Sequence, residues 1–213
     1  MEDFTSQYRA AFSNLGRPLK DEDAISEEEI IAVETRLSCV LPASLKDFVR
    51  VAGRADDFFG VFDRLISLEE WCLDDGKLVF MEENQAVVLW GVELEKVEDP
   101  PVFQATNAAP LAWDEVSACC SKFLMTMLHF EATFGGAMPF CGSAVVKPQI
   151  RTQLDKEWNF VGEVTEIRAY HQSGCALCFT EWDGDWQVFA GATEQSTLNE
   201  IAKKLKIEFE DYD

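Results

Sequence analysis

The spacing of hydrophobic residues changes along this chain, and the change limits the folds open to it. In the first quarter, apolar residues recur at helical spacing; Ile30, Val33 and Leu37, for example, lie on one face of a helix. After a loop at Asp56–Gly60, short runs of strand-forming residues follow instead. A helix, a second set of strands and a last helix come next. Because helices and strands do not alternate one by one, the order predicts an α+β protein with helices packed on antiparallel sheet.

The turn and capping residues place the expected elements. Ser26 and Glu29 have the spacing of a capping box, and Gly53 is expected to end the helix that follows Leu41-Pro42. Asp183-Gly184 is typical of a tight hairpin, across which we expect Trp182 and Trp186 to pair. Helices are predicted at Phe4–Leu15, 26–37, 42–52, Glu115–Phe134 and Leu198–Leu205, and strands at Lys77–Glu82, Ala86–Val92, Val102–Ala105, Val164–His171, Ala176–Trp182 and Trp186–Ala190.

A stretch rich in Gly, Pro and small residues, Ala137–Gln149, predicts a long loop or a domain boundary. We therefore expect an α+β domain over residues 22–136 and a C-terminal extension over 137–213, made of a strand meander and a helix. The extension is either a unit of its own or a continuation of the first sheet.

The charge balance indicates what the chain binds. It has 39 acidic and 18 basic side chains, a net charge of −21 and a pI of about 4.3, while 47% hydrophobic residues are enough for a packed core. Residues 1–135 hold 26 acidic and 11 basic groups, a net −15, and the remainder carries −6. Such a charge repels nucleic acid and anionic membranes and attracts basic proteins. The plainer alternative is that acidity only keeps the protein soluble.

The termini and the cysteines favour a cytoplasmic protein. The start, Met1-Glu2-Asp3, is acidic, no apolar stretch follows it, and no uncharged run is long enough to cross a membrane. The seven cysteines are an odd number, which is expected of free thiols in a reducing compartment.

The sequence contains no motif that predicts catalysis, a cofactor or a metal. Phosphate-binding glycine loops, a serine-hydrolase elbow and H-E-x-x-H are all missing. His129 and His171 are the only histidines; each could be a base or a ligand, although a lone histidine is more often structural. Cys175 and Cys178 form a CxxC, but on a predicted strand they point to opposite faces and cannot easily share a metal or a disulfide. We therefore expect a non-enzymatic protein without a cofactor.

Two stretches together resemble the SUKH superfamily, which includes bacterial immunity proteins and the yeast cell-wall-synthesis regulator family. The first runs Ile30…Glu34…Leu37…Leu41-Pro42…Leu45…Phe48…Gly53 and is similar to the opening helix pair of that family. The second runs Glu83-Asn84-Gln85…Trp90-Gly91-Val92…Asp99-Pro100-Pro101-Val102 and is similar to its turn, its Trp-containing strand and the entry to the next strand. The match spans roughly Ile25–Gly136; the rest of the chain resembles nothing familiar.

This resemblance implies a protein-binding module, because many bacterial members are thought to neutralise a cognate toxin, often a nuclease. Fungal members act in signalling and scaffolding, so a regulatory or scaffold protein without a toxin partner is the alternative. The acidic charge agrees with a basic toxin as partner, whereas the sequence does not indicate an oligomeric state. The candidate contact residues lie in the acidic part: Asp56, Asp57, Asp63, Glu82, Glu83 and Trp90, the last of which fits the core better than a contact surface.

Overall fold

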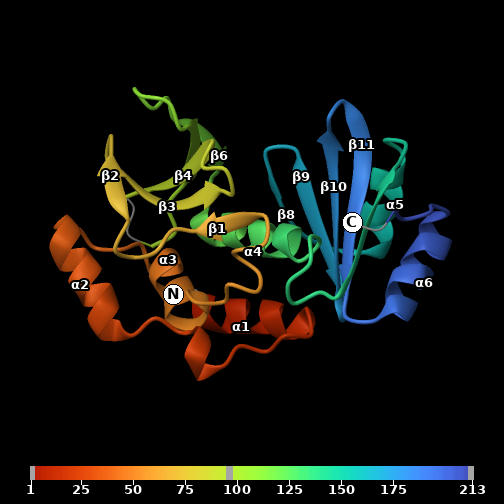
Figure 1. The fold of residues 1–213 in the computed structure, drawn as a ribbon, viewed down its shortest axis with the longest axis horizontal. Helices are drawn as coiled ribbons and strands as arrows, with labels where there is room; N and C mark the ends of the chain where they lie inside the picture. Colours follow the sequence, from red (N-terminus) through yellow and green to blue (C-terminus); the bar gives the residue numbers. More distant parts are fainter. Residues whose placement is uncertain (1–2, 95–97, 211–213) are drawn as a thin grey trace. The chain divides into compact units, whose positions relative to one another are not determined.

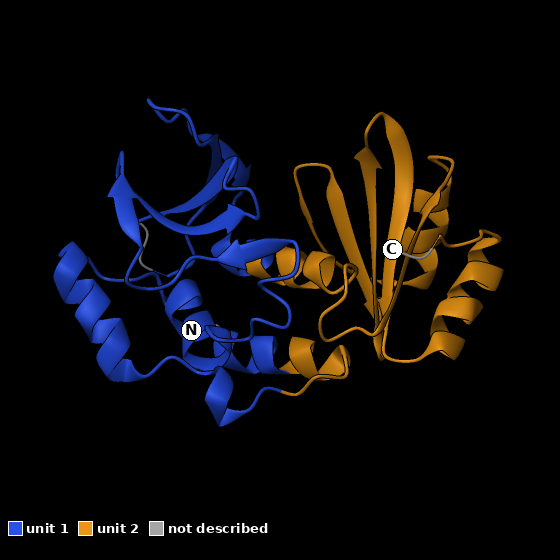
Figure 2. Cartoon of the chain, viewed as in Figure 1, with its two compact units in different colours: residues 1–9, 19–123 blue, residues 10–18, 124–213 orange. Residues whose placement is uncertain are grey.

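The protein is an α+β protein, as the order of the predicted elements required. The computed structural model describes residues 3–94 and 98–210 (Figure 1). They divide into two compact units (Figure 2): unit 1 comprises residues 1–9 and 19–123, and unit 2 comprises residues 10–18 and 124–213. The helices are α1 (Phe4–Asn14), the short 3-10 helix η1 (Asp21–Asp23), α2 (Glu27–Leu37), α3 (Ala43–Ala52), α4 (Cys120–Glu131), α5 (Ile150–Glu157) and α6 (Gln195–Leu205).

Helix α2 begins where its capping residues predict. The backbone N–H of Glu29 donates to Ser26 Oγ at 3.3 Å, and the Ser26 N–H donates back to the Glu29 carboxylate at 3.1 Å. This reciprocal pair satisfies two backbone donors that the first turn of a helix leaves open, and it confirms the predicted capping box. Three glutamates in that turn also complement the positive end of the helix dipole.

Helix α3 is held on the core of unit 1 by its apolar face. It begins after Pro42 and ends at Gly53, as predicted. Phe48 on the buried face packs edge-on against Tyr8, with ring centres 5.0 Å apart. The Tyr8 hydroxyl donates to the carbonyl of Ser44 at 3.1 Å, so this buried phenol has a hydrogen-bond partner.

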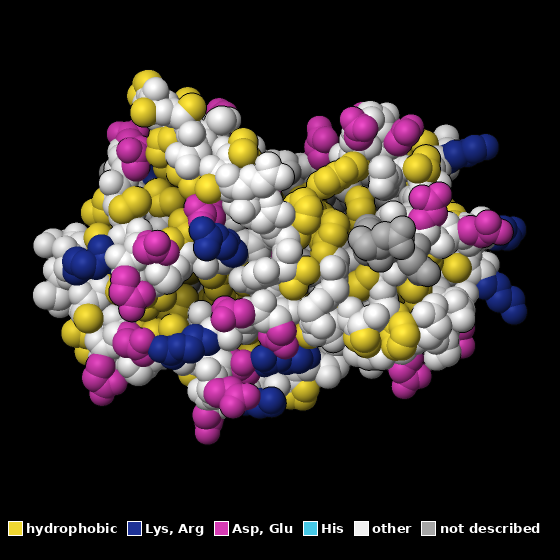
Figure 3. Space-filling model, viewed as in Figure 1, with side chains coloured by type: hydrophobic (Ala, Val, Ile, Leu, Met, Phe, Trp, Pro, Cys, Tyr) yellow, Lys and Arg dark blue, Asp and Glu magenta, His cyan; other side chains and the backbone are white. Residues whose placement is uncertain are grey.

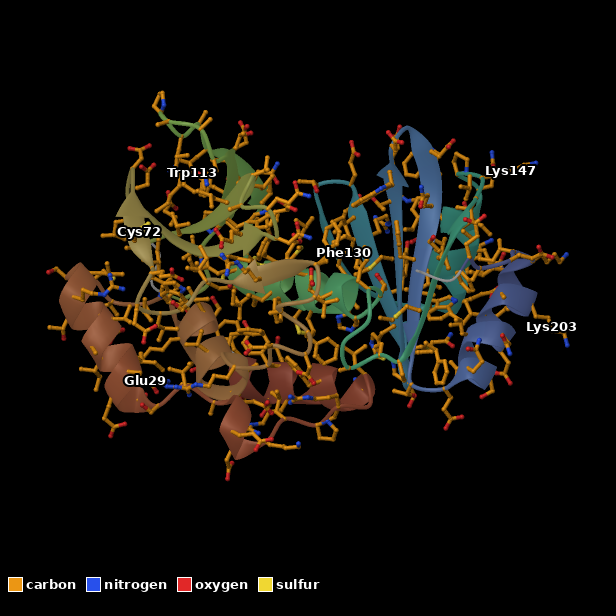
Figure 4. The ribbon with its side chains drawn as sticks, viewed as in Figure 1. Glu29, Cys72, Trp113, Phe130, Lys147 and Lys203 are labelled. Atoms are coloured by element: carbon orange, nitrogen blue, oxygen red, sulfur yellow. The ribbon has the colours of Figure 1, made fainter. Side chains whose placement is uncertain are left out.

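Ion pairs neutralise much of the acidic charge of this helical layer. Lys46 lies 3.1 Å from Glu34, and Arg50 lies 2.9 Å from Glu27. Arg54, just after α3, pairs with Glu29 at 2.6 Å; Glu29 is labelled on α2 in Figure 4. Three of the four acidic side chains of α2, those of Glu27, Glu29 and Glu34, are therefore balanced by cations of α3 and the residues that follow it, whereas Glu28 is exposed without an ion pair to a described residue.

Six antiparallel strands form the sheet of unit 1. They are β1 (Asp63–Leu65), β2 (Cys72–Asp74), β3 (Lys77–Glu83), β4 (Val88–Glu93), β5 (Val102–Thr106) and β6 (Asp114–Ser117). The strand order is β1-β3-β4-β5-β6, and β2 pairs with the first half of β3. The predicted strands at 77–82, 86–92 and 102–105 correspond to β3, β4 and β5, whereas β1, β2 and β6 were not predicted.

The long helix begins later than its sequence suggests. Glu115–Phe134 was predicted as one helix, but Asp114–Ser117 is strand β6, and α4 starts only at Cys120. The reason is a cap supplied from another part of unit 1: Asp99 accepts hydrogen bonds from the backbone N–H and the hydroxyl of Ser121, at 2.8 and 2.6 Å. Such a non-local cap has no signature next to the helix in the sequence.

Unit 2 has its own antiparallel sheet, in the order β7-β11-β10-β9-β8. Its strands are β7 (Phe140–Val145), β8 (Asn159–Val164), β9 (Ile167–Gln172), β10 (Cys175–Trp182) and β11 (Asp185–Ala192). Strand β7 corrects the loop predicted at Ala137–Gln149. Small residues give β7 little intrinsic strand preference, but it pairs with β11 on one side and with Glu210 of the C-terminal tail, through Ser143, on the other.

The hairpin at Asp183-Gly184 is confirmed, but the two tryptophans beside it do not pair. Both turn residues have positive φ, and the two-residue loop places Trp182 opposite Asp185. Trp186 is therefore one position further along and points to the other face of the sheet, where it stacks on Phe179 at 4.8 Å. Trp182 instead contacts Phe189.

The two faces of this sheet are covered differently. One face carries the hydrophobic core of unit 2, to which α5 and α6 contribute Leu154, Leu198, Ile201 and Leu205. On the other face, the end of α4 approaches β11 so closely that a Cβ on Gly191 would lie 1.9 Å from the carbonyl oxygen of Ala132. Glycine at this position is what lets the helix lie against the strand.

The boundaries of the compact units differ from the predicted domain division at residue 136. Within the described residues, the strands of 63–117 and those of 140–192 pair in separate sheets. Residues 10–18 belong to unit 2, where the Gly174 N–H donates to the Asn14 carbonyl at 2.7 Å. Domain limits of 22–136 and 137–213 stay a prediction. No helix within residues 3–94 and 98–210 has the length and apolar character needed to cross a membrane.

The capping box yields a test of how much α2 depends on its first turn. We expect Ser26→Ala to lower the free energy of unfolding by about 1 kcal/mol, because the Glu29 N–H loses its acceptor. Ser26→Asp, which keeps an acceptor at the same position, is the matched control and should stay within about 0.5 kcal/mol of the parent. Urea unfolding measures both; equal losses in the two variants would contradict the capping role.

Candidate functional site

Three of the predicted partner-contact residues meet on two paired strands of unit 1. The register of β1 and β3 places Asp63 opposite Glu83 and Arg64 opposite Glu82. Arg64 and Glu82 form an ion pair. Glu83 accepts hydrogen bonds from two backbone N–H groups of the following turn, at 3.0 and 3.4 Å. Both glutamates are half-buried, so each already serves the hairpin that carries it.

Asp63 is a buried carboxyl group beside another carboxylate. It is 3% exposed. The pKa of Asp63 is raised from its ordinary 3.8 to about 7. Burial is the larger cause, because it disfavours the ionised carboxylate, and the negative charge of Glu83 adds to the effect. Asp63 can therefore take up or release a proton near neutral pH.

The other three predicted residues are separate from this pair in the chain. Asp56 and Asp57 lie in the loop between α3 and β1; Asp56 is exposed and Asp57 is half-buried. Trp90 lies on β4, is 8% exposed and has its ring centre 6.1 Å from that of Phe123. This burial is what a core tryptophan shows. A contact with a partner stays a prediction for all six residues.

Two exposed carboxylates that the sequence did not single out lie on β6, the outer strand of the sheet in unit 1. Asp114 and Glu115 are both exposed, and neither forms an ion pair with another described residue. They were missed because Glu115 was assigned to the first turn of a helix. A hollow of about 200 Å³ borders Asp114 and is lined by Gln104, Ala105, Thr106, Ala108, Pro110 and Ala112.

Acidic side chains therefore differ in how freely they are available in unit 1. Glu27, Glu29 and Glu34 of α2 are balanced by neighbouring cations, whereas Glu28, Asp56 and the two carboxylates of β6 are not paired within the described part of the chain. Figure 3 shows one face of the protein, on which Lys and Arg side chains lie among Asp and Glu side chains over the helices of unit 1. The loosely held carboxylates are the ones a basic partner can reach without breaking an existing ion pair.

In unit 2 the structure brings the two histidines of the chain together. His129 on α4 and His171 on β9 have ring centres 5.5 Å apart. Burial lowers the pKa of His129 to about 4 and also lowers the pKa of His171. Both rings are thus neutral at physiological pH. Across the described residues, no group of three or more His, Cys, Asp or Glu side chains is arranged to hold a metal ion.

The seven cysteines, all within the described part, are free thiols. Cys175 and Cys178 lie on β10, as the sequence predicted for this CxxC, and both are buried. Burial raises the pKa of each thiol, so neither has the lowered pKa of a redox-active cysteine.

Comparison with known proteins does not assign the chain. No family model matches it, and no curated protein matches it. The resemblance to the SUKH superfamily therefore remains a hypothesis based on the residues quoted above.

The buried carboxyl group of Asp63 makes stability depend on pH in a defined direction. Below pH 3.8 Asp63 is protonated whether or not the chain is folded; between 3.8 and about 7 only the folded state retains the proton. This contribution to stability is therefore lost progressively as pH rises from 3.8 to about 7 and is absent above the folded-state pKa. Asp63→Asn, which stays neutral, should gain at least about 1 kcal/mol relative to the parent between pH 4 and pH 8.

Urea unfolding at several pH values measures this gain. Asp56→Asn removes an exposed carboxylate from the same unit and serves as the control, with a pH profile parallel to that of the parent. If Asp63→Asn also runs parallel to the parent, the interpretation of the Asp63–Glu83 pair is wrong.

Proposed function

We propose that this protein is a non-enzymatic binding protein of the immunity type, a member of the SUKH superfamily that neutralises a cognate basic toxin of the nuclease class in the cytoplasm. The observation that carries the proposal is the net charge of −21, of which −15 belongs to residues 1–135. Nucleases that bind phosphate backbones are often basic, and an acidic protein attracts such a partner over long distances.

The arrangement of unit 1 supports the family part of this proposal. The Leu41-Pro42 junction lies between α2 and α3, and Gly53 ends α3. The Trp90 strand is β4, and Asp99-Pro100-Pro101 leads into β5. These elements follow one another in the order that the resemblance implies.

The exposed carboxylates support the electrostatic part. Asp56, Asp114 and Glu115 form no ion pair with a described residue, so a cationic partner can approach them without displacing a lysine or arginine of this chain. Charges at the rim of an interface mainly increase the association rate and its salt dependence. We therefore place the first encounter with the partner on unit 1.

A regulatory or scaffold protein without a toxin partner is the second candidate. In that case the acidity serves solubility. The product of the neighbouring gene separates the two proposals: a basic, toxin-like protein there that binds this chain supports the immunity function. A partner that is neither basic nor toxic supports the scaffold.

The first experiment measures binding of the neighbouring gene product to the full chain at increasing salt. For the immunity proposal we expect association to slow steeply as salt rises, because screening weakens attraction between exposed charges. The toxin's activity should also fall in the complex. Binding that is indifferent to salt would contradict the electrostatic part, and no binding would contradict the proposal as a whole.

A matched pair of variants then locates the encounter surface. Asp56→Asn with Asp114→Asn and Glu115→Gln removes three exposed charges from unit 1. Glu181→Gln with Asp183→Asn and Asp185→Asn removes three exposed charges from the β10–β11 hairpin of unit 2. We expect the unit 1 variant to associate at least about threefold more slowly at low salt and the hairpin variant to stay close to the parent. Equal slowing in both would indicate a diffuse attraction without a preferred surface.

A further inference from the structure

Packing in unit 2 sets two imidazole rings from different elements against each other. The close approach of Ala132 to Gly191 seats the end of α4 on the sheet, and His129 lies one turn earlier on the same helix. His171 lies on β9, where the register places it opposite Ala176 of β10. The ring centres are 5.5 Å apart, with an angle of 51° between the ring planes.

The hydrogen bond of His129 fixes which of its nitrogens is free. Its Nδ1 lies 2.8 Å from the carbonyl oxygen of Met125. A carbonyl only accepts, so Nδ1 carries the hydrogen, and in the neutral ring Nε2 then carries a lone pair. This side chain is 1% exposed, and Nε2 has no hydrogen-bond partner among the described residues. A buried acceptor without a donor is costly, which calls for an explanation.

His171 has the complementary feature. Its Nδ1 is buried and also has no hydrogen-bond partner among the described residues. The side chain as a whole is half-buried, so solvent reaches part of the ring although Nδ1 itself is covered. Its neighbours on the same face of the sheet, Ala169 and Ala176, are small.

We propose that His129 Nε2 and His171 Nδ1 together bind one divalent transition-metal ion that prefers nitrogen ligands, with Zn²⁺ as the representative, and that water completes its coordination. The ring separation fits such a site. Zn²⁺ lies about 2.0–2.1 Å from an imidazole nitrogen, so two rings that bind one ion at a tetrahedral angle have centres about 5 Å apart. The observed separation is 5.5 Å.

The surroundings of His129 have the form that metal-binding histidines require. Its second ring nitrogen donates to a backbone carbonyl, the usual way in which proteins orient a ligand imidazole and fix its tautomer. Figure 4 labels Phe130, the next residue on α4, which is 2% exposed. The described residues supply no third ligand, so the site is open to exchange rather than a closed structural centre.

This inference is independent of the proposed partner binding, and the composition of the chain permits a direct test. His129 and His171 are its only histidines, so labelling the full chain with histidine that carries ¹⁵N only in the ring gives signals from four ring nitrogens alone. Zn²⁺ is then titrated in, and the ring ¹⁵N shifts are followed by NMR. We expect His129 Nε2 and His171 Nδ1 to move together and to saturate at one ion per chain, while His129 Nδ1 keeps the shift of a protonated nitrogen.

Two variants distinguish this site from binding to thiols. In the His171→Ala variant, Zn²⁺ should no longer shift the His129 Nε2 signal. The affinity of the chain for Zn²⁺ should also fall at least about tenfold. His171→Asn gives the same test if the alanine variant folds poorly. Cys72→Ser, which removes an exposed thiol from unit 1, should leave both histidine shifts as in the parent.

Three results would overturn the proposal. Unchanged ring nitrogens at a stoichiometric excess of Zn²⁺ would show that the pair does not bind the ion. A shift of His129 Nε2 that survives His171→Ala would show that His171 is not a ligand. A direct N–H···N hydrogen bond between the two rings that Zn²⁺ fails to displace would show that each imidazole already satisfies the other.

Discussion

Mutual repulsion among 39 carboxylates is the constraint to which the rest of the structure responds. A compact state with a net charge of −21 has to keep its acidic groups hydrated, paired or protonated, since self-repulsion otherwise favours expansion. Unit 1 uses all three solutions. The acidic face of α2 is paired with cations, the carboxylates of β6 remain in water, and the pKa of Asp63 is raised so that it can retain its proton.

The pairing of α2 with α3 also bears on the function we propose. Exposed ion pairs contribute little to stability individually, typically about 0–1 kcal/mol. Their larger effect here is to cancel the field of one surface, so that the attraction for a basic protein is concentrated elsewhere. The carboxylates of β6 and Asp56 are among those left to create that field. The unpaired acidic charge is thus concentrated on part of the surface instead of being spread evenly over it.

The residues that depart from simple rules are polar groups in the interior. Asp63 of unit 1 and His129 of unit 2 are both almost fully buried, and each lies beside a group of its own kind, Glu83 and His171 respectively. Burying such pairs costs free energy, which the apolar packing of each unit has to offset. Elsewhere in the chain, local sequence preferences agree with the structure that forms. These two pairs are therefore the places to look for a function beyond packing.

Capping and turn residues predicted several elements correctly, because the interactions that define these elements are made between residues close in the sequence. The box of Ser26 and Glu29, the stop at Gly53 and the turn at Asp183-Gly184 depend on atoms within a few residues of one another. The predicted start of α4 was wrong because its cap, Asp99, lies more than twenty positions away from Ser121 in the sequence. Strand β7 was not predicted because its small residues form a strand only through pairing with β11 and with Glu210 of the C-terminal tail.

The candidate sites divide in the same way. The sequence by itself determined the α+β class, the charge and its bias toward residues 1–135, since these depend only on composition and on the period of apolar residues. It also limited imidazole ligands to two histidines. Only the tertiary structure decided that Asp63 is buried beside Glu83, that β6 exposes its carboxylates, and that the two histidine rings lie next to each other. Each of these depends on strand register or helix packing, which join residues far apart in the chain and leave no mark in either local stretch.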